Sequence, residues 1–237
     1  MLALLDTRAP RELLVGLERI GHSICLMPLY AALPSPVAAH PDMLLFFGKD
    51  SIITTKEYYA FAKKLLERIA ATCQKRIHLT AQAVSDLYPK DVLLNAAPVG
   101  SHLFCLPSST AREILSQYTE DLILPVRQGY TKCSILPVTR QALITQDSSI
   151  ASIARKSGFE VLEITPGQIR LPGYDTGFIG GAASAMPYRD CKEILFCGEL
   201  DSHPDGTLIR EFCISHHKKP IEIKGLPLTD VGTLFLI

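Results

Sequence analysis

The chain has 237 residues, of which 47% are hydrophobic and 20% charged, and its 24 basic and 24 acidic residues give a formal charge of zero. This length supports one or two domains with a sizeable core. Because no long block of like charge occurs, the composition gives no electrostatic support for a nucleic-acid partner or an anionic membrane partner.

The seven cysteines are an odd number without a CxxC pair, and several lie in apolar, strand-like runs such as 101–106 and 193–198. The first residues reach Asp6 before any apolar stretch long enough for export, and no run approaches the length of a membrane span. We therefore expect a reduced, cytoplasmic protein whose thiols are mostly buried.

In chain order, a strand, a helix and a second strand recur five times. The expected units are strand 2–6, helix 9–21 and strand 23–28; a strand and helix within 50–73 and strand 76–80; a strand and helix within 101–118 and strand 121–126; strand 141–145, helix 147–158 and strand 160–164; and strand 193–198, a helix near 206–215 and strand 220–223. The fourth unit is the clearest, because Asp147 and Ser148 are good N-caps and Gly158 is a good residue to end the helix.

A short closing segment follows each unit, and it consists of a turn-like lead, a polar residue and an apolar strand. These segments begin near residues 40, 88, 129, 173 and 227, and their polar residues are Asp42, Asp91, Lys132, Asp175 and Asp230. The pattern predicts an α/β fold built from five repeats, roughly 1–50, 51–100, 101–139, 140–190 and 191–237, in a single domain. The alternative is an ordinary α/β domain whose strands resemble one another without a repeat.

This layout resembles the pentein, or guanidino-group modifying enzyme, fold, which is a five-bladed α/β propeller of ββαβ-like units with pseudo-fivefold symmetry. The sequences of residues 129–134 and 173–181 also resemble those of a bacterial family of uncharacterised function that is assigned to this fold. The resemblance covers the whole chain and implies that the five repeated polar residues converge on a central pocket. Gly177, Gly180 and Gly181 would then let an inner strand approach the axis or a ligand closely.

Enzymes of this fold hydrolyse or transfer an amidino group through a Cys thiolate, with a His as acid and base and with carboxylates that hold the guanidinium. His40-Pro41-Asp42 is similar to their H-x-D motif, the run 129–134 to their cysteine motif, and 174–177 to their R-D-T-G motif. The resemblance implies Cys133 as nucleophile, His40 as acid and base, and Asp230 as the residue that orients His40. It implies substrate contacts from Asp42, Asp91, Asp175, Asn95, Arg127 and Lys132, a small cationic guanidino or amidino ligand, and no metal or organic cofactor.

Two departures from the family pattern keep a second function open. The order of the units is rotated relative to the deiminases, and the C-terminal strand has no Cys. Cys133 would be a core thiol if 132–138 is a strand, because adjacent strand residues point to opposite faces. His40 and the acids would then be turn residues. The alternative function is a non-catalytic pentein that binds a small cationic ligand or a protein or ribosomal partner. The sequence does not indicate the oligomeric state.

Overall fold

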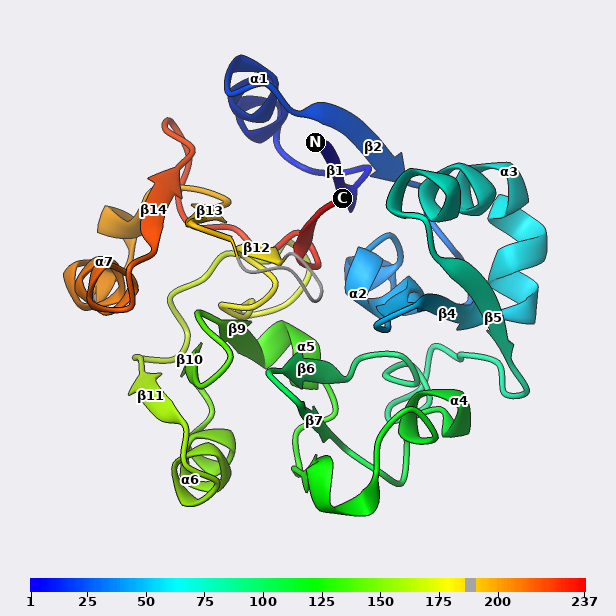
Figure 1. The fold of residues 1–237 in the computed structure, drawn as a ribbon. Helices are drawn as coiled ribbons and strands as arrows, with labels where there is room; N and C mark the ends of the chain where they lie inside the picture. Colours follow the sequence, from blue (N-terminus) through cyan, green and yellow to red (C-terminus); the bar gives the residue numbers. More distant parts are fainter. Residues whose placement is uncertain (186–190) are drawn as a thin grey trace.

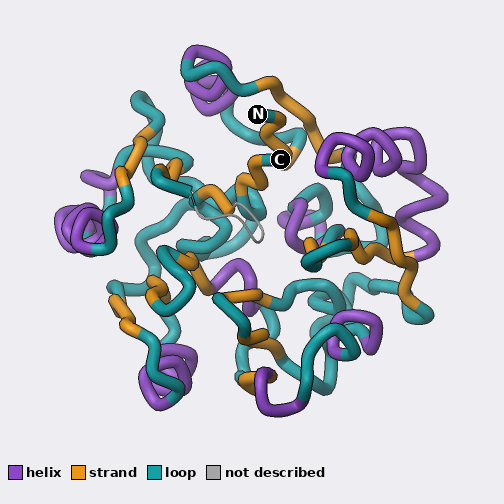
Figure 2. The backbone as a smooth tube through the Cα atoms, in the orientation of Figure 1, coloured by secondary structure: helices purple, strands orange, loops and turns teal. Residues whose placement is uncertain are grey.

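Short strands lie toward the middle of the molecule and helices lie around its outside in the computed structural model (Figure 1). The structure describes residues 1–185 and 191–237. Within these residues the strands form five small sheets, so the chain has a mixed α/β fold. Figure 2 shows that loops connect the inner strands to the outer helices around the whole molecule.

The sheets share one plan, in which a middle strand pairs antiparallel with an inner strand and parallel with an outer strand. In the sheet of β13 the antiparallel contact is a single bridge between Ala183 and Phe196. The inner, middle and outer strands are β15 (Leu234–Leu236), β1 (Leu2–Asp6) and β2 (Ser23–Met27); β3 (Phe46–Phe47), β4 (Ser51–Thr55) and β5 (Arg76–Thr80); β6 (Ala97–Val99), β7 (His102–Cys105) and β8 (Ile123–Pro125); β9 (Ile135–Pro137), β10 (Ala142–Thr145) and β11 (Glu160–Glu163); and β12 (Ser184–Ala185), β13 (Glu193–Phe196) and β14 (Lys219–Glu222).

Helices occupy the crossovers that parallel strands require. Those between middle and outer strands are α1 (Arg11–Arg19), α3 (Lys56–Cys73), α4 (Arg112–Leu115), α6 (Ser148–Lys156) and α7 (Gly206–Ser215), with the 3₁₀ turns η2 (Glu120–Leu122) and η3 (Leu200–Ser202) beside two of them. The 3₁₀ turn η1 (Ser35–Val37) precedes α2 (Pro41–Leu44). Two single-turn helices, α2 and α5 (Thr131–Ser134), lead into inner strands β3 and β9.

The longest helix, α3, shows how sequence sets these elements. The Thr55 side chain accepts a hydrogen bond from the Tyr58 amide at 3.1 Å and so caps the first turn. Tyr58, Ala62 and Leu66 follow at intervals of four and are buried, so one stripe of the helix faces the core. Gln74 ends the helix in a left-handed conformation.

The two ends of the chain meet in one sheet. Leu2 donates to the Ile237 carbonyl at 2.8 Å, and Ile237 donates to the Leu2 carbonyl at 3.0 Å. Strand β1 thereby pairs antiparallel with β15. This pairing brings the segment before β15, residues 230–233, to the centre of the molecule beside α2 (Figure 1).

The expectation of strands at the closing segments is wrong in its details. Residues 41–44 and 131–134 are helical turns, residues 91–94 form a turn, and the strands begin only after them. The expected helix within 101–118 is only the four-residue α4. Pro41 explains one of these differences, because proline lacks the amide that a strand ladder needs and is favoured at the first position of a helix.

Within the described residues, none of the seven cysteines forms a disulfide. Within the described part of the chain, no helix combines the length and the apolar character needed to cross a membrane.

Candidate functional site

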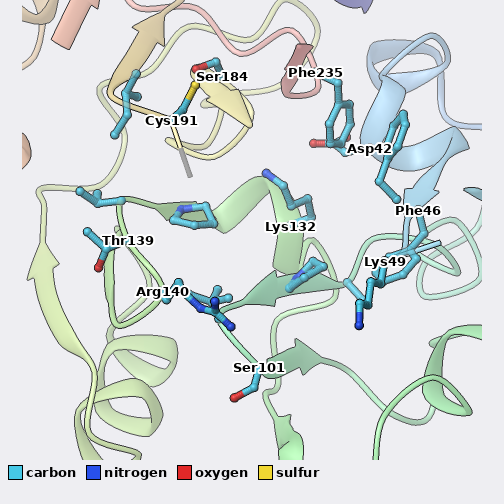
Figure 3. A pocket seen from close by; sticks show the side chains of 18 of the residues that line it. Asp42, Phe46, Lys49, Ser101, Lys132, Thr139, Arg140, Ser184, Cys191 and Phe235 are labelled. Carbon is cyan, nitrogen blue, oxygen red and sulfur yellow. The ribbon is translucent and has the colours of Figure 1, made fainter. Parts of the chain in front are cut away.

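A cavity of about 900 Å³ lies at the centre of the molecule, where the inner strands meet. Phe46 of β3, Pro98 of β6, Pro137 of β9, Ile194 of β13 and Phe235 of β15 line it, so all five sheets contribute. Figure 3 shows Phe46 and Phe235 on its wall, together with Ser184 of β12, which pairs parallel with β15. We refer to it as the central cavity. Its mostly apolar wall and its size are typical of small-molecule sites.

Charged side chains differ between the floor and the opening of this cavity. Asp42 and Lys132 are buried, 1% and 6% exposed, and form the floor. Lys49, Arg140 and Glu193 are exposed and mark the opening. Figure 3 shows the Lys132 side chain pointing into the cavity from α5. A ligand would therefore enter past the exposed charges and reach Asp42 and Lys132 last.

Asn95 fixes α5 against α2. Its Oδ1 accepts from the amides of Lys132 at 2.8 Å and Cys133 at 3.3 Å, which are free amides at the start of a helix. Its Nδ2 donates to the Asp42 carbonyl at 3.1 Å and approaches the sulfurs of Met43 and Cys133 at 3.2 Å. One buried amide side chain thus sets the position of Lys132 and Cys133 relative to Asp42.

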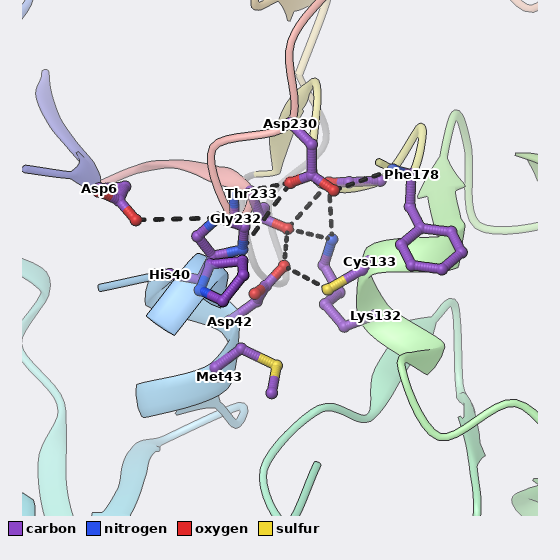
Figure 4. A network of polar contacts seen from close by, with 12 residues as sticks. Asp6, His40, Asp42, Met43, Lys132, Cys133, Phe178, Asp230, Gly232 and Thr233 are labelled. Carbon is purple, nitrogen blue, oxygen red and sulfur yellow. Dashed lines mark hydrogen bonds and ion pairs between the residues drawn. The ribbon is translucent and has the colours of Figure 1, made fainter. Parts of the chain in front are cut away.

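Cys133 lies behind the cavity floor and does not line it. Its side chain is 1% exposed, and the thiol donates to Asp42 Oδ2 at 3.3 Å (Figure 4). Burial, followed by the nearby carboxylates of Asp42 and Asp230, raises the pKa of the Cys133 thiol well above its ordinary value. The thiol is therefore the protonated form in this arrangement.

Thr233 connects the two groups of the floor. Its hydroxyl donates to Asp42 Oδ2 at 2.7 Å and accepts from Lys132 Nζ at 3.0 Å. Lys132 Nζ also approaches the Gly180 carbonyl at 3.5 Å. Burial lowers the pKa of Lys132, while the charges of Asp42, Cys133 and Asp230 oppose that shift. Within the described residues, Lys132 makes no ion pair at 4.0 Å or less.

His40 lies between two carboxylates on the other side of Asp42. Its Nε2 is 3.8 Å from Asp6 Oδ2, and its Nδ1 is 3.9 Å from Asp230 Oδ1 (Figure 4). Asp230 accepts from the amides of Gly232 and Phe178, each at 2.9 Å, and burial raises the pKa of its carboxyl group. The residues Asp6, His40 and Asp230 are each at most 3% exposed.

Arg8 holds Asp6 from the surface side. Its Nη2 contacts Asp6 Oδ2 at 2.6 Å, and its guanidinium also donates to the carbonyls of Ser35 and Pro36. The contact with Asp6 raises the pKa of Arg8, mainly through the side-chain hydrogen bond. Arg8, Asp6 and His40 therefore form a line of ionisable side chains from the surface to the site.

Five of the residues expected from the sequence lie close together: Cys133, Asp42, Asn95 and Lys132 share direct contacts, and Asp230 acts on Lys132 and Cys133 through its charge. His40 joins the group through Asp230. Sequence reasoning missed Asp6 and Thr233. Asp6 is the last residue of an apolar strand, and Thr233 follows Asp230 in the closing segment. Their positions in the repeat are the sequence signal that could have identified both as site residues.

Asp91 is buried but outside this group. It is 0% exposed, and its Oδ2 accepts a hydrogen bond from the Tyr130 hydroxyl. This aromatic partner holds the carboxylate on a different side of α5, and Asp91 does not line the central cavity.

Asp175 and Arg127 are exposed and line no part of the central cavity, which differs from the expectation that they bind substrate there. The turn at 171–176 carries Asp175 outward, and the following glycines reach the centre in its place. A Cβ added to Gly181 would stand 2.0 Å from Asp230 Oδ1, and one added to Gly180 would stand 2.3 Å from the Ile135 carbonyl. The bare backbone therefore makes room for Asp230 and α5.

Within residues 1–185 and 191–237, two buried polar atoms of the site have no hydrogen-bond partner, namely His40 Nδ1 and Asp42 Oδ1. Buried polar atoms are rarely left unpaired, so each needs a partner such as a water molecule or a ligand. Within the described residues, no set of three or more His, Cys, Asp or Glu side chains is arranged to hold a metal ion.

A family model described as "Family of unknown function (DUF6873)" matches residues 4–235, and the chain belongs to that family. No curated protein matches the sequence. Three solved structures of dimethylarginine dimethylaminohydrolase are similar to the chain at 12% identity, with TM-scores of 0.52, 0.53 and 0.54.

These structures cover 94% of this chain, which in turn covers 92%, 91% and 92% of theirs. They are an adduct with 4-chloro-2-hydroxymethylpyridine, a cysteine-to-serine variant from Pseudomonas aeruginosa in complex with citrulline, and a histidine-to-glycine variant adduct with S-methyl-L-thiocitrulline. At this identity the likeness shows the fold alone. It confirms a mixed α/β fold that matches pentein-type proteins.

Proposed function

We propose that residues 1–237 form a single five-bladed pentein-type domain, and that its centre is the active site of a Cys-dependent hydrolase or transferase acting on a guanidino or amidino compound. The recurring plan of inner, middle and outer strands supports the five-bladed arrangement. The likeness to dimethylarginine dimethylaminohydrolase supports the general class of ligand, since those structures contain citrulline and a thiocitrulline derivative.

One observation carries the proposal: a thiol, an imidazole and two carboxylates from three separate segments meet at and behind the floor of the central cavity. Cys133 comes from α5, His40 and Asp42 from the start of α2, and Asp230 from the segment before β15. These are the groups that amidino chemistry requires, namely a nucleophile, an acid and base, and anions for a planar cation.

Each group has a role in this scheme. Asp42, whose Oδ1 is unpaired, accepts the guanidinium of the ligand. Burial, followed by the carboxylates of Asp42 and Asp230, raises the pKa of the Cys133 thiol, and the bound cation offsets the contribution of the carboxylates, so Cys133 passes its proton to His40 as the ligand binds. The sulfur then bonds to the amidino carbon, the bond from that carbon to the leaving amine breaks, and His40 gives the amine a proton. In the hydrolase, water attacks the same carbon and releases the thiol.

The scheme requires that the ligand reach the Cys133 sulfur. Cys133 Sγ lies 3.3 Å behind Asp42 Oδ2, while Lys132 and Asp42 line the cavity. The ligand head must therefore displace the Lys132 ammonium from the floor before sulfur and carbon meet.

Alkylation of the native protein by 2-chloroacetamidine and by neutral 2-chloroacetamide, resolved by peptide mass spectrometry, tests the proposal. We expect Cys133 to react with the amidine at least about tenfold faster than with the amide, because the carboxylates concentrate the cation. The Cys133→Ala variant should lose this label. The Cys105→Ala variant, which removes an equally buried thiol in β7, should keep it. Equal, slow reaction of Cys133 with both reagents until the protein unfolds would exclude the catalytic role.

The burial of Cys133 favours a second candidate function, a non-catalytic domain that binds a small cationic ligand or a protein partner. A thiol that is 1% exposed and donates to Asp42 acts as a structural group. In that case the Cys133→Ala variant should bind a guanidino ligand such as arginine as tightly as the native chain. Calorimetric titration of both proteins distinguishes the two functions.

A further inference from the structure

Of the residues of α5, Lys132 lines the central cavity and Cys133 does not. The Lys132 amine is therefore the nucleophile of α5 that a ligand in the cavity can contact. The Cys133 thiol lies behind Asp42, whereas the Lys132 side chain lines the cavity and points into it (Figure 3). The Lys132 side chain sits at the floor with only 6% of the residue exposed. A molecule that reaches the floor of the cavity therefore contacts this amine and not the Cys133 thiol.

The surroundings of Lys132 are those of a reactive lysine. The amine is held by a hydroxyl and a carbonyl, those of Thr233 and Gly180, and within the described residues no carboxylate lies close enough to form an ion pair with it. The ring of Phe235 lies 5.9 Å from Nζ and adds an apolar wall. Burial lowers the pKa of Lys132, so a larger fraction of the free amine is present near neutral pH than for an exposed lysine.

Thr233 provides a path for the proton that such an amine gives up. Its hydroxyl stands between Lys132 Nζ at 3.0 Å and Asp42 Oδ2 at 2.7 Å. The residue holds a φ of +65°, a conformation in which β-branched residues are rare, so the local backbone places this hydroxyl against a steric preference. Residues held in such conformations gather at functional sites.

The opening of the cavity indicates the charge of the ligand. Lys49 and Arg140 line the cavity, are exposed, and have no ion-pair partner within the described residues. The acid at the opening, Glu193, pairs with Lys219 at 3.1 Å, whereas Asp42 lies at the buried floor. At the opening, the charges without an ion-pair partner in the described residues are therefore positive, and they complement an anionic group.

We propose that Lys132 forms an imine with a small aldehyde or ketone that carries an anionic group, held by Lys49 and Arg140 at the cavity opening. The Lys132 nitrogen adds to the carbonyl carbon, and the carbonyl oxygen takes a proton from a solvent water to become the hydroxyl of a carbinolamine. The Thr233 hydroxyl passes the proton lost by the nitrogen to Asp42. The hydroxyl of the carbinolamine then takes that proton back from Asp42 and leaves as water, and the nitrogen keeps its remaining proton in a protonated carbon–nitrogen double bond. The step needs no oxidant or reductant and does not depend on Cys133.

Reductive trapping tests this site in the full native chain. Glyoxylate, a small anionic aldehyde, is added with sodium cyanoborohydride, whose hydride reduces the imine to a stable secondary amine, and the modified lysines are mapped by peptide mass spectrometry. At about pH 7 we expect Lys132 to be labelled faster than Lys49, because burial lowers the pKa of Lys132 and its amine lines the floor of the cavity. Asp42, Asp230 and Cys133 are the titratable groups that act on this amine, and the labelling is followed from about pH 6 to about pH 9.

Four variants make the result specific. Lys132→Arg keeps the charge and should abolish the label, whereas Lys49→Met should slow labelling of Lys132 by glyoxylate but not by neutral glycolaldehyde. Thr233→Val should slow labelling at least about fivefold, and Thr233→Ser should restore it, because only the serine returns the hydroxyl.

Labelling of Lys132 only after unfolding would overturn the proposal. Equal labelling by glyoxylate and glycolaldehyde in the native chain would overturn the anionic class of ligand. Neither result bears on amidine labelling of Cys133, so the two proposals fail separately.

Discussion

Thr233 combines an unfavourable backbone conformation with a central place in the hydrogen-bond network. Its φ is +65°, and the residue is fully buried. Such a conformation costs about 1–3 kcal/mol in a β-branched residue and persists only where surrounding contacts offset the cost. Here the hydrogen bonds to Asp42 and from Lys132 supply that offset.

We expect Thr233→Val to lower the free energy of unfolding by about 1–3 kcal/mol, because it leaves the buried Lys132 and Asp42 groups without this partner at nearly constant volume. Thr233→Ser keeps the hydroxyl and should stay within about 1 kcal/mol of the native chain. Urea unfolding followed by circular dichroism measures both. A valine variant as stable as the native chain would show that the hydroxyl bonds contribute nothing.

Gly181 is required by contact with a neighbouring side chain. An added Cβ would stand 2.0 Å from Asp230 Oδ1 and 2.3 Å from its Cγ. Because Asp230 is held by two backbone amides, it cannot move without losing them. We expect Gly181→Ala to cost about 1–3 kcal/mol through overpacking and to shift Asp230 away from His40.

Gly158→Ala is the matched control for this prediction. Its added Cβ meets nothing within 4 Å, so only the strain of its φ of +83° remains, about 1–2 kcal/mol. Thermal unfolding gives the stability of both variants, and the histidine NMR signals report the surroundings of His40. An unchanged His40 signal in Gly181→Ala would contradict the expected shift of Asp230.

The site residues could be foreseen from the sequence where they occupy equivalent places in the repeat. Asp42, Lys132 and Asp230 follow the turn-like leads, and all three are buried at the centre. Asp175 occupies the same place in the pattern but is exposed, because glycines take up the central position in its unit. Which of two nearby polar groups turns inward depends on neighbouring segments, and a pattern within one segment does not contain that information.

At the scale of elements, the long periodic stretches were predictable and the single turns were not. The helix expected near 206–215 is α7, and the one expected at 147–158 is α6, capped by Asp147. Residues 131–134, in contrast, form one helical turn, since Asn95 binds its first amides from another repeat. As a turn, α5 lets both Lys132 and Cys133 approach Asp42, which a strand would prevent.

The ion pair between α7 and β14 makes a pH-dependent contribution to stability. Glu222 accepts from Arg210 Nε at 2.7 Å and from the Leu200 amide at 2.9 Å. The Arg210 hydrogen bond, followed by this amide and Lys224, lowers the pKa of Glu222 from 4.5 to about 2. A lowered carboxyl pKa stabilises the fold above the ordinary pKa and loses that effect as the pH falls through the folded value.

We therefore expect Glu222→Gln to lower the free energy of unfolding by about 1–2 kcal/mol at neutral pH. The difference from the native chain should shrink between about pH 5 and about pH 2. Urea titrations across this range measure the effect. Glu67→Gln, which removes an exposed partner of Lys63, should change stability little at any of these pH values. A difference for Glu222→Gln that stays constant with pH would rule out the lowered pKa as its cause.

At the scale of the whole molecule, the first and last strands pair in one sheet (Figure 1). In the proposed five-bladed arrangement, this pairing closes the ring of sheets. The pairing of β1 with β15 also holds Asp230 and Thr233 against α2, where they contact His40 and Asp42. The site is consequently assembled only when the ends of the chain have paired. Since each sheet follows one plan, the starting point of the chain within the ring is not fixed by the architecture.

A circular permutant tests this view of closure. Joining residues 237 and 1 by a short Gly/Ser linker and opening the chain between Pro166 and Gly167, in an exposed loop, keeps every sheet intact. We expect the permutant to fold with a loss of about 1–2 kcal/mol, or about 2–8 °C in Tm. Opening the chain between Ile52 and Ile53 instead interrupts the buried strand β4, and that permutant should not fold cooperatively. Failure of the first permutant to fold would show that the order of the repeats matters for assembly. Its success, with Cys133 and Lys132 still inaccessible to large reagents, would explain how a rotated order of units is compatible with the same central site.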